Sequence, residues 1–144
     1  MDEDAAPAER PEWFSTVGRR GRLSFLMNFL FVNIGIGIIT AIAGSMEGLL
    51  TSLIVAGCSI GGGWVNICLT AQRLHDMDRS GWLQVIPFLA ALLGVTLLAS
   101  DDPLWDGLGV VFLLAGCLGF SLWLLFTPGT AESNRYGPRP PIAT

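Results

Sequence analysis

The chain has 144 residues, of which 51% are hydrophobic and 14% charged, and its formal net charge is −4. This length corresponds to one domain, and a mean hydropathy of +0.57 is too high for an ordinary soluble domain. The three cysteines are odd in number and form no CxxC pair, so the sequence indicates neither a disulfide framework nor a zinc site. A membrane is therefore the expected surroundings of most of the chain.

Residues 1–13, MDEDAAPAERPEW, are rich in acidic residues and proline and contain almost no large apolar residue before Trp13. Such a segment cannot bury enough apolar surface to offset the entropy lost on folding. We expect it to form a disordered cytoplasmic tail.

Four apolar blocks follow, at about residues 23–44, 49–70, 82–99 and 107–126, and none contains Asp, Glu, Lys or Arg. At about 1.5 Å per residue, each block can cross a hydrocarbon core about 30 Å thick. The first block is too long for a secretory signal peptide, whose apolar region has about 7–15 residues. The short connections SMEG and SDDPLWD force their flanking helices to run antiparallel. The sequence predicts an all-α polytopic membrane protein, with four transmembrane helices in two antiparallel hairpins over residues 14–127 and a carboxyl-terminal tail over 128–144.

The arginines predict the orientation. The chain has no lysine, and all eight arginines precede the first block, join the second to the third, or follow the fourth. Basic residues are retained on the cytoplasmic side of membrane proteins. We therefore expect a bacterial cytoplasmic (inner) membrane protein with both termini in the cytoplasm.

Three polar segments meet on the predicted cytoplasmic face: GRRGR (18–22), QRLHDMDRSGW (72–82) and PGTAESNRYGPRPP (128–141). If the second helix continues past its span, Arg73, Asp76 and Arg79 lie three residues apart and can form a ladder of ion pairs. Gly81 is then expected to end that helix. The candidate site residues are Arg19, Arg22, Arg73, His75, Asp76, Arg79, Ser80, Asn134, Arg135 and Tyr136.

Four interpretations of this cluster remain open. The charges can pair with one another to clasp the helix ends, since buried charge needs a partner, or the arginines can grip an anion such as a lipid phosphate. A catalytic role would make His75 a base oriented by Asp76 or Asp78, with Ser80 or water as nucleophile, although adjacent helical residues diverge and no nucleophile motif is present. A metal held by His75, Asp76 and Asp78 would have only one histidine ligand.

The three polar segments, in this order around four spans, resemble the domain of unknown function 805 family of small bacterial inner-membrane proteins. The resemblance covers residues 14–141, and Gln72, Leu26, Asp78 and Glu132 depart from the family pattern, which usually has arginine at 72, often an aromatic at 26 and frequently glycine at 78 and 132. It implies location and topology but no activity. The matching residues are Gly18, Arg19, Arg22, Arg73, Leu74, His75, Asp76, Ser80, Gly81, Trp82, Pro128, Gly129, Asn134, Arg135, Tyr136, Gly137 and Pro138.

The main functional hypothesis is a non-enzymatic membrane module whose cytoplasmic cluster packs the helix ends and binds an anionic lipid headgroup or a partner. We expect membrane lipids, a homo-oligomer or another membrane protein as partners, and no nucleic acid, cofactor or metal. The alternative is an oligomeric small-solute channel or transporter, because the spans are rich in glycine and contain asparagine. No ionisable group other than cysteine lies inside the spans, which argues against ion-coupled transport. The Gly57-Gly61 GxxxG pair is expected to pack helices.

Overall fold

The computed structural model describes residues 13–45, 48–100 and 102–140. In this part of the chain, four helices are long and apolar enough to cross a membrane, which confirms the predicted all-α, four-span fold. The third crossing combines a short 3-10 helix with an α-helix, and the fourth contains a π-helical turn. The elements are α1 (Arg22–Gly44), α2 (Leu49–Asp76), η1 (Gly81–Gln84), α3 (Val85–Leu98), α4 (Pro103–Leu113), η2 (Leu114–Gly119) and α5 (Phe120–Phe126).

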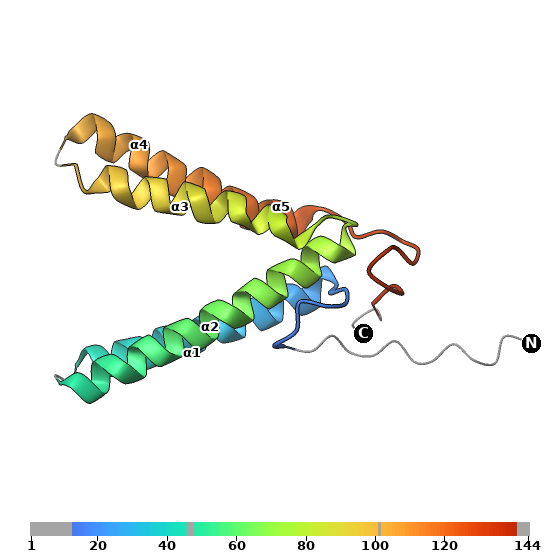
Figure 1. Ribbon diagram of the computed structural model, residues 1–144, viewed down its shortest axis with the longest axis horizontal. Coiled ribbons are helices and arrows are strands. Elements are labelled where there is room, and N and C mark those ends of the chain that lie inside the picture. Colours follow the sequence, from blue (N-terminus) through green and yellow to red (C-terminus); the bar gives the residue numbers. More distant parts are fainter. Residues whose placement is uncertain (1–12, 46–47, 101, 141–144) are drawn as a thin grey trace, which may run out of the picture.

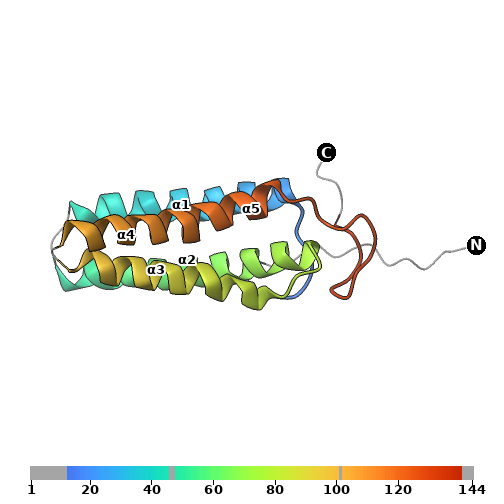
Figure 2. The same ribbon diagram turned by 90° about the horizontal axis from the view of Figure 1, so that it is seen from above.

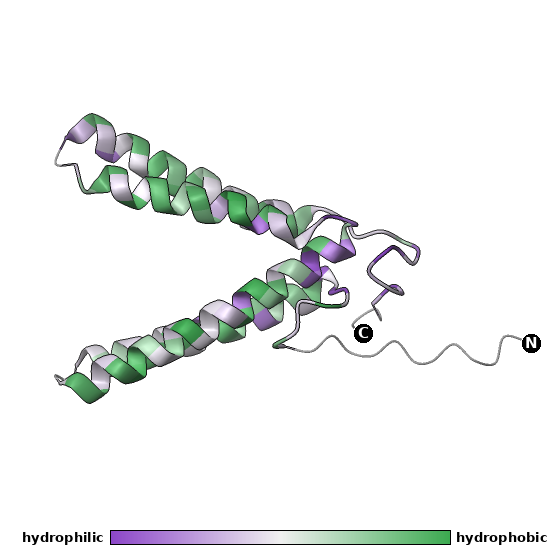
Figure 3. Ribbon diagram, viewed as in Figure 1, coloured by the Kyte–Doolittle hydropathy of each residue, from purple (hydrophilic) through white to green (hydrophobic). Residues whose placement is uncertain are grey.

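The helices form because hydrocarbon offers no water to backbone N–H and C=O groups, so each crossing segment must satisfy them internally. Their outward faces are apolar and exposed, as at Phe31 and Ile60. Hydrophilic residues concentrate at the end of the molecule where the two helix pairs meet (Figure 3). We call this end, where residues 13–21, 77–80 and 127–140 meet the adjoining ends of α1, α2 and α5, the arginine-rich end.

The four helices form a V. Helix α1 packs along α2, and α3 packs along α4, while contacts between the two pairs involve η1 and α5 near the arginine-rich end. From there the pairs diverge (Figure 1). After a turn of 90° they overlie each other, so the divergence lies in one plane (Figure 2).

Small residues allow close approach within the second pair. A Cβ atom on Gly94 of α3 would lie 2.9 Å from the carbonyl oxygen of Gly109 in α4, so only glycine permits this backbone contact. The Gly57-Gly61 pair differs, because no atom of the described residues outside the helix's own backbone lies within 4 Å of a Cβ built there. This GxxxG pair does not pack helices within the described chain, contrary to expectation.

Helix α2 continues past Thr70 to Asp76, where a Schellman motif ends it. Asp78 has a left-handed φ of +54° and donates its N–H to the His75 carbonyl at 3.1 Å, while the Arg79 N–H reaches the Leu74 carbonyl at 2.8 Å. The prediction that Gly81 ends the helix is therefore wrong.

The predicted Asp76–Arg79 pairing is also wrong, because Arg79 lies beyond the last turn of α2. The fourth helix begins at Pro103 rather than Gly107. Asp102 caps it by accepting the Leu104 N–H at 2.8 Å, and proline suits the first helical turn because its missing N–H is not needed there.

Burial is concentrated at the arginine-rich end. An apolar core there includes Phe25, Leu69, Leu74 and Leu124. Charged and polar groups are buried at the same end. Burying ionised groups is unfavourable unless each has partners, so the contacts of these side chains decide what this end can do. The buried polar and charged residues are Arg19, Arg20, Gln72, Arg73 and Asp76.

Candidate functional site

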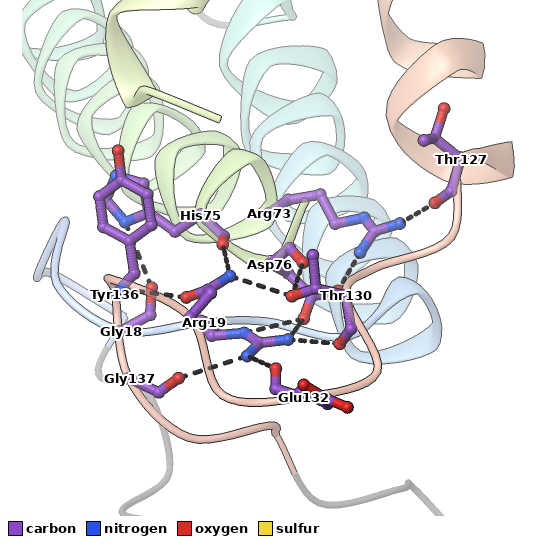
Figure 4. Close-up of polar contacts among 11 residues, drawn as sticks. Gly18, Arg19, Arg73, His75, Asp76, Thr127, Thr130, Glu132, Tyr136 and Gly137 are labelled. Atoms are coloured by element: carbon purple, nitrogen blue, oxygen red, sulfur yellow. Dashed lines mark hydrogen bonds and ion pairs between the residues drawn. The ribbon is translucent and has the colours of Figure 1, made fainter. Parts of the chain in front are cut away.

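The Asp76 carboxylate lies between two guanidinium groups. Its Oδ1 accepts from Arg19 Nε at 3.2 Å and from Arg19 Nη2 at 3.0 Å, and its Oδ2 accepts from Arg73 Nη1 (Figure 4). Asp76 is 4% exposed and Arg73 fully buried. The predicted Arg73–Asp76 pair is confirmed. Two opposite charges compensate the desolvated carboxylate, and we call these three residues the Asp76 clasp.

Arg19 joins the carboxyl-terminal tail to the end of α2. Beyond its two bonds to Asp76, it donates from Nη1 to the carbonyls of Glu132 at 2.7 Å and Gly137 at 3.3 Å, and from Nη2 to that of Thr130 at 2.8 Å. All five guanidinium N–H groups are thereby used. Arg19 has no donor left for an external anion.

Arg73 joins the two helix pairs. Its Nε donates to the Leu124 carbonyl at 2.9 Å and its Nη2 to the Thr127 carbonyl, at the end of α5. The last carbonyls of a helix have no partner within the helix, and a cation is favourable near that negative end of the helix dipole. Arg73, a residue of α2, therefore caps the carboxyl-terminal end of α5 in the fourth crossing.

A second buried pair, Arg20 and Gln72, was missed by the sequence analysis. Arg20 Nε donates to Gln72 Oε1 at 2.8 Å, and Gln72 Nε2 donates to the Ser15 carbonyl at 2.6 Å. Burial lowers the pKa of Arg20, although a guanidinium stays protonated near neutral pH. Gln72 thus supplies an acceptor to a buried cation.

His75, Asn134 and Tyr136 come together at the end of α2. The His75 ring stacks on Tyr136 with centroids 3.8 Å apart, and its Nδ1 lies 3.3 Å from the Gly18 carbonyl (Figure 4). Asn134 Nδ2 donates to the His75 carbonyl at 2.8 Å, and its Oδ1 accepts the Tyr136 N–H at 2.9 Å. These contacts fold the tail onto the end of α2.

The remaining candidates lie outside the clasp. Arg135 pairs with Asp78 at 3.2 Å, in an exposed position, and its guanidinium carbon lies 4.9 Å from the Tyr136 ring centroid. Ser80 Oγ accepts the Trp82 N–H at 3.4 Å at the start of η1. Arg22 and Arg79 are exposed and have no ion pair among the described residues.

The geometry does not assemble the catalytic or metal-binding groups that the sequence left open. The Asp76 carboxylate is held by two arginines, Asp78 pairs with Arg135, and His75 contacts a backbone carbonyl and an aromatic ring. Within residues 13–45, 48–100 and 102–140, no three His, Cys, Asp or Glu side chains are placed to share a metal ion.

A cavity of about 320 Å³ lies between the start of α1 and the tail. Arg22 and Arg139 line it, are exposed, and form no ion pair within the described chain. The α1 N-cap, Gly21, provides no side-chain cap, so the first N–H groups of the helix lack that partner. Cations and the first N–H groups of a helix around one cavity suit an anion. The lining residues are Gly21, Arg22, Leu23, Ser24, Asp76, Pro128, Gly129, Thr130, Arg139 and Pro140.

Gly129, Thr130 and Arg139 were not among the candidate residues. A Cβ atom on Gly129 would overlap the Asp76 carboxylate, and Thr130 donates its N–H to the Asp76 carbonyl at 2.8 Å. The Pro128-Gly129 dipeptide, a sequence typical of turns, was the available signal for a change of chain direction here. The role of Arg139 had no signal, because proline-rich sequence does not reveal where a tail folds back.

Comparison with known proteins places this arrangement in a family. No curated protein and no solved structure matches the chain. A family model described as "Protein of unknown function (DUF805)" matches residues 13–138, which include all three residues of the Asp76 clasp. Because this match covers most of the chain, the protein belongs to the DUF805 family.

Proposed function

We propose that this protein is a non-enzymatic module of the bacterial cytoplasmic membrane that binds anionic lipid headgroups at its arginine-rich end. The arginine distribution supports an orientation with both termini in the cytoplasm, where basic residues of membrane proteins collect. Anionic lipids give the cytoplasmic leaflet a negative surface potential that attracts such a basic end.

The cavity between α1 and the tail carries the proposal. Arg22 and Arg139 present guanidinium groups that are not used in ion pairs within the described chain, and guanidinium matches phosphate oxygens in bidentate geometry. The uncapped start of α1 adds N–H groups and the positive end of the helix dipole. Arg22 is the first residue of a helix that is long and apolar enough to cross a membrane, and this position supports a cavity at the depth of lipid headgroups.

The Asp76 clasp has a different role in this proposal. Arg19 has no free donor, and Arg73 is fully buried and bound to Asp76 and to the carbonyls of Leu124 and Thr127. The clasp therefore holds the frame in which Arg22 and Arg139 face the same cavity. The two guanidinium groups of the clasp outnumber its single carboxylate, so the clasp is itself net positive.

The test is thermal unfolding in a neutral detergent with short-chain phosphatidic acid, using short-chain phosphatidylcholine as the comparison lipid. A ligand that binds only the folded state stabilises it by about 2.7 kcal/mol at a hundredfold excess over Kd. We expect phosphatidic acid to raise the Tm of the wild type and to lose this effect in the Arg22→Ala/Arg139→Ala variant.

Arg79→Ala is the matched control, because Arg79 is exposed at the same end but does not line the cavity. This variant should keep the phosphatidic acid response. An equal loss in Arg79→Ala would mean that the attraction is spread over the whole basic end, and would contradict a defined site.

A further inference from the structure

A second cavity, of about 310 Å³, lies between the two helix pairs. Its walls come from α2, from η1 with the start of α3, and from η2 with α5, so both helix pairs contribute. The volume is at the lower end of the range found for small-molecule sites, about 300–1,000 Å³. The exposure of Ile67 and Phe88 on its rim leaves it open to the surrounding lipid.

The polar groups in this cavity carry no charge. They are the side chains of Asn66, Thr70, Gln84 and Ser121. Asn66 is hydrogen-bonded to Asn33 at 3.2 Å, and Ser121 donates to the Cys117 carbonyl at 2.7 Å. The Thr70 hydroxyl and the Gln84 amide have no hydrogen-bond partner within the described residues. Because polar groups without partners are unfavourable in an apolar medium, these two are available to a ligand.

The cavity lies just inside the membrane boundary. Thr70 is about 30 Å along the helix axis from Leu49, at about 1.5 Å per residue, so it is near the end of the hydrocarbon core on the arginine-rich side. Trp82, two residues before Gln84, is exposed, and an indole at this place suits the membrane interface. Lipid glycerol and ester groups occupy this depth, and the two helix pairs that diverge from it consist mainly of hydrophobic residues (Figure 3).

One wall of the cavity is irregular. Cys117 belongs to the π-helical turn η2, whose wider turn interrupts the fourth crossing between α4 and α5. Single π-helical turns within α-helices occur frequently at functional sites. Here the turn precedes Ser121, so it sets how this polar side chain is presented to the cavity.

We propose that this cavity binds the polar end of an uncharged membrane lipid bearing a free hydroxyl, of the diacylglycerol type. The Gln84 amide can donate to an ester carbonyl, and the Thr70 hydroxyl can accept from the lipid hydroxyl. The acyl chains would lie along the apolar helix faces between the two pairs. A phosphate is disfavoured, because no cationic side chain lines the cavity to compensate its charge on desolvation.

The experiment uses the full chain in phosphatidylcholine nanodiscs with a photoactivatable diacylglycerol, whose crosslinks are located by mass spectrometry. We expect the wild type to be labelled at the cavity. Labelling should fall at least fivefold in Thr70→Val/Gln84→Leu, which keeps side-chain size but removes the hydrogen bonds. It should fall similarly in Ala91→Phe, which fills the space.

Thr96→Val is the matched control, because it removes a hydroxyl from α3 that is bonded to the Leu93 carbonyl and lies outside the cavity. Its labelling should equal that of the wild type. The Arg22→Ala/Arg139→Ala variant should also be labelled like the wild type, because these arginines line the cavity between α1 and the tail and not this one. Helical content and gel-filtration profile establish that the double variant Thr70→Val/Gln84→Leu is folded.

Two outcomes would overturn the proposal. Undiminished labelling of the folded double variant would show that the probe contacts the protein only as surrounding lipid. Competition by unlabelled phosphatidic acid as strong as by unlabelled diacylglycerol would show a site for phosphate lipids instead. Selective competition by diacylglycerol, lost in the double variant, is the result we expect.

Discussion

Asp76 is the one carboxylate that the two buried arginines of the clasp share. Its two oxygens are shared between Arg19 and Arg73, which in turn bind carbonyls of the tail and of α5. Loss of the carboxylate charge leaves two buried guanidinium groups without an anion. The cost of breaking a buried charge pair greatly exceeds that of a surface pair.

We therefore expect Asp76→Asn to lower the free energy of unfolding by about 3 kcal/mol, the lower end of the range for breaking a buried ion pair. Asp78→Asn is the control, because it removes the same charge from an exposed pair with Arg135 and should cost less than about 1 kcal/mol. Reversible unfolding in mixed micelles measures both. Equal costs would contradict the clasp.

Gly129 provides a second test at the residue scale. A methyl group there would overlap the Asp76 carboxylate, which cannot move away without releasing Arg19 or Arg73. We expect Gly129→Ala to destabilise the protein by about 1–3 kcal/mol, as overpacking does. Gly21→Ala, at the same end, has an ordinary φ of −66° and no atom within 4 Å, so its effect on the same unfolding curve should stay within about 0.5 kcal/mol.

The backbone at Asp78 gives a third prediction. Its φ of +54° is a conformation that favours glycine. Asp78→Gly and Asp78→Ala both remove the pair with Arg135, so they differ mainly in backbone cost. We expect Asp78→Ala to be about 1 kcal/mol less stable than Asp78→Gly. Identical unfolding free energies would show that the turn relaxes to another conformation.

The sequence predicted these contacts only where they are local. Arg73 and Asp76 lie on one helix, so their spacing sufficed. Arg19 reaches Asp76 from 57 positions away, and the residue type alone could not tell Arg19, which is buried, from Arg22, which is exposed. Which arginine is consumed internally depends on the three-dimensional path of the tail.

At the scale of the elements, hydropathy located the helices but not all of their ends. Apolar length reports which residues can lie in hydrocarbon, and α2 continues past Thr70 because a helix can extend beyond the membrane. The helix ends where Asp78 adopts a left-handed conformation. The sequence analysis placed this end at Gly81, because glycine is the residue that most often adopts that conformation after a helix. The glycine pattern likewise could not show which small residues face a neighbouring helix.

Close packing of α3 on α4 is testable at this scale. Gly94→Leu would force side-chain atoms against the Gly109 carbonyl and Leu113, so we expect the second helix pair to separate and the Tm to fall. Gly57→Leu in α2 is the control, because a Cβ atom at Gly57 meets no neighbouring atom within 4 Å, and its Tm should be unchanged. A shift to a smaller oligomer in Gly57→Leu would instead reveal an intermolecular role for the GxxxG pair.

At the scale of the whole molecule, the arginine-rich end combines two tails and the central connection. An even number of crossings returns the chain to the side from which it started, and the Asp76 clasp ties the three segments together there. The opposite end has only two short connections, and the sequence contains no arginine in either of them. The side on which each end lies follows from where arginine is retained during insertion.

Single cysteines test this orientation in a background where Cys58, Cys68 and Cys117 are replaced by alanine. Ser45→Cys is exposed at the opposite end, and Ser133→Cys is exposed in the tail at the arginine-rich end. A membrane-impermeant maleimide should label Ser45→Cys in intact spheroplasts and Ser133→Cys only after permeabilisation. The reverse pattern would place Arg22 and Arg139 outside the cell. The proposed site would then face away from the negatively charged cytoplasmic surface, and its attraction for anionic headgroups would lose that electrostatic support.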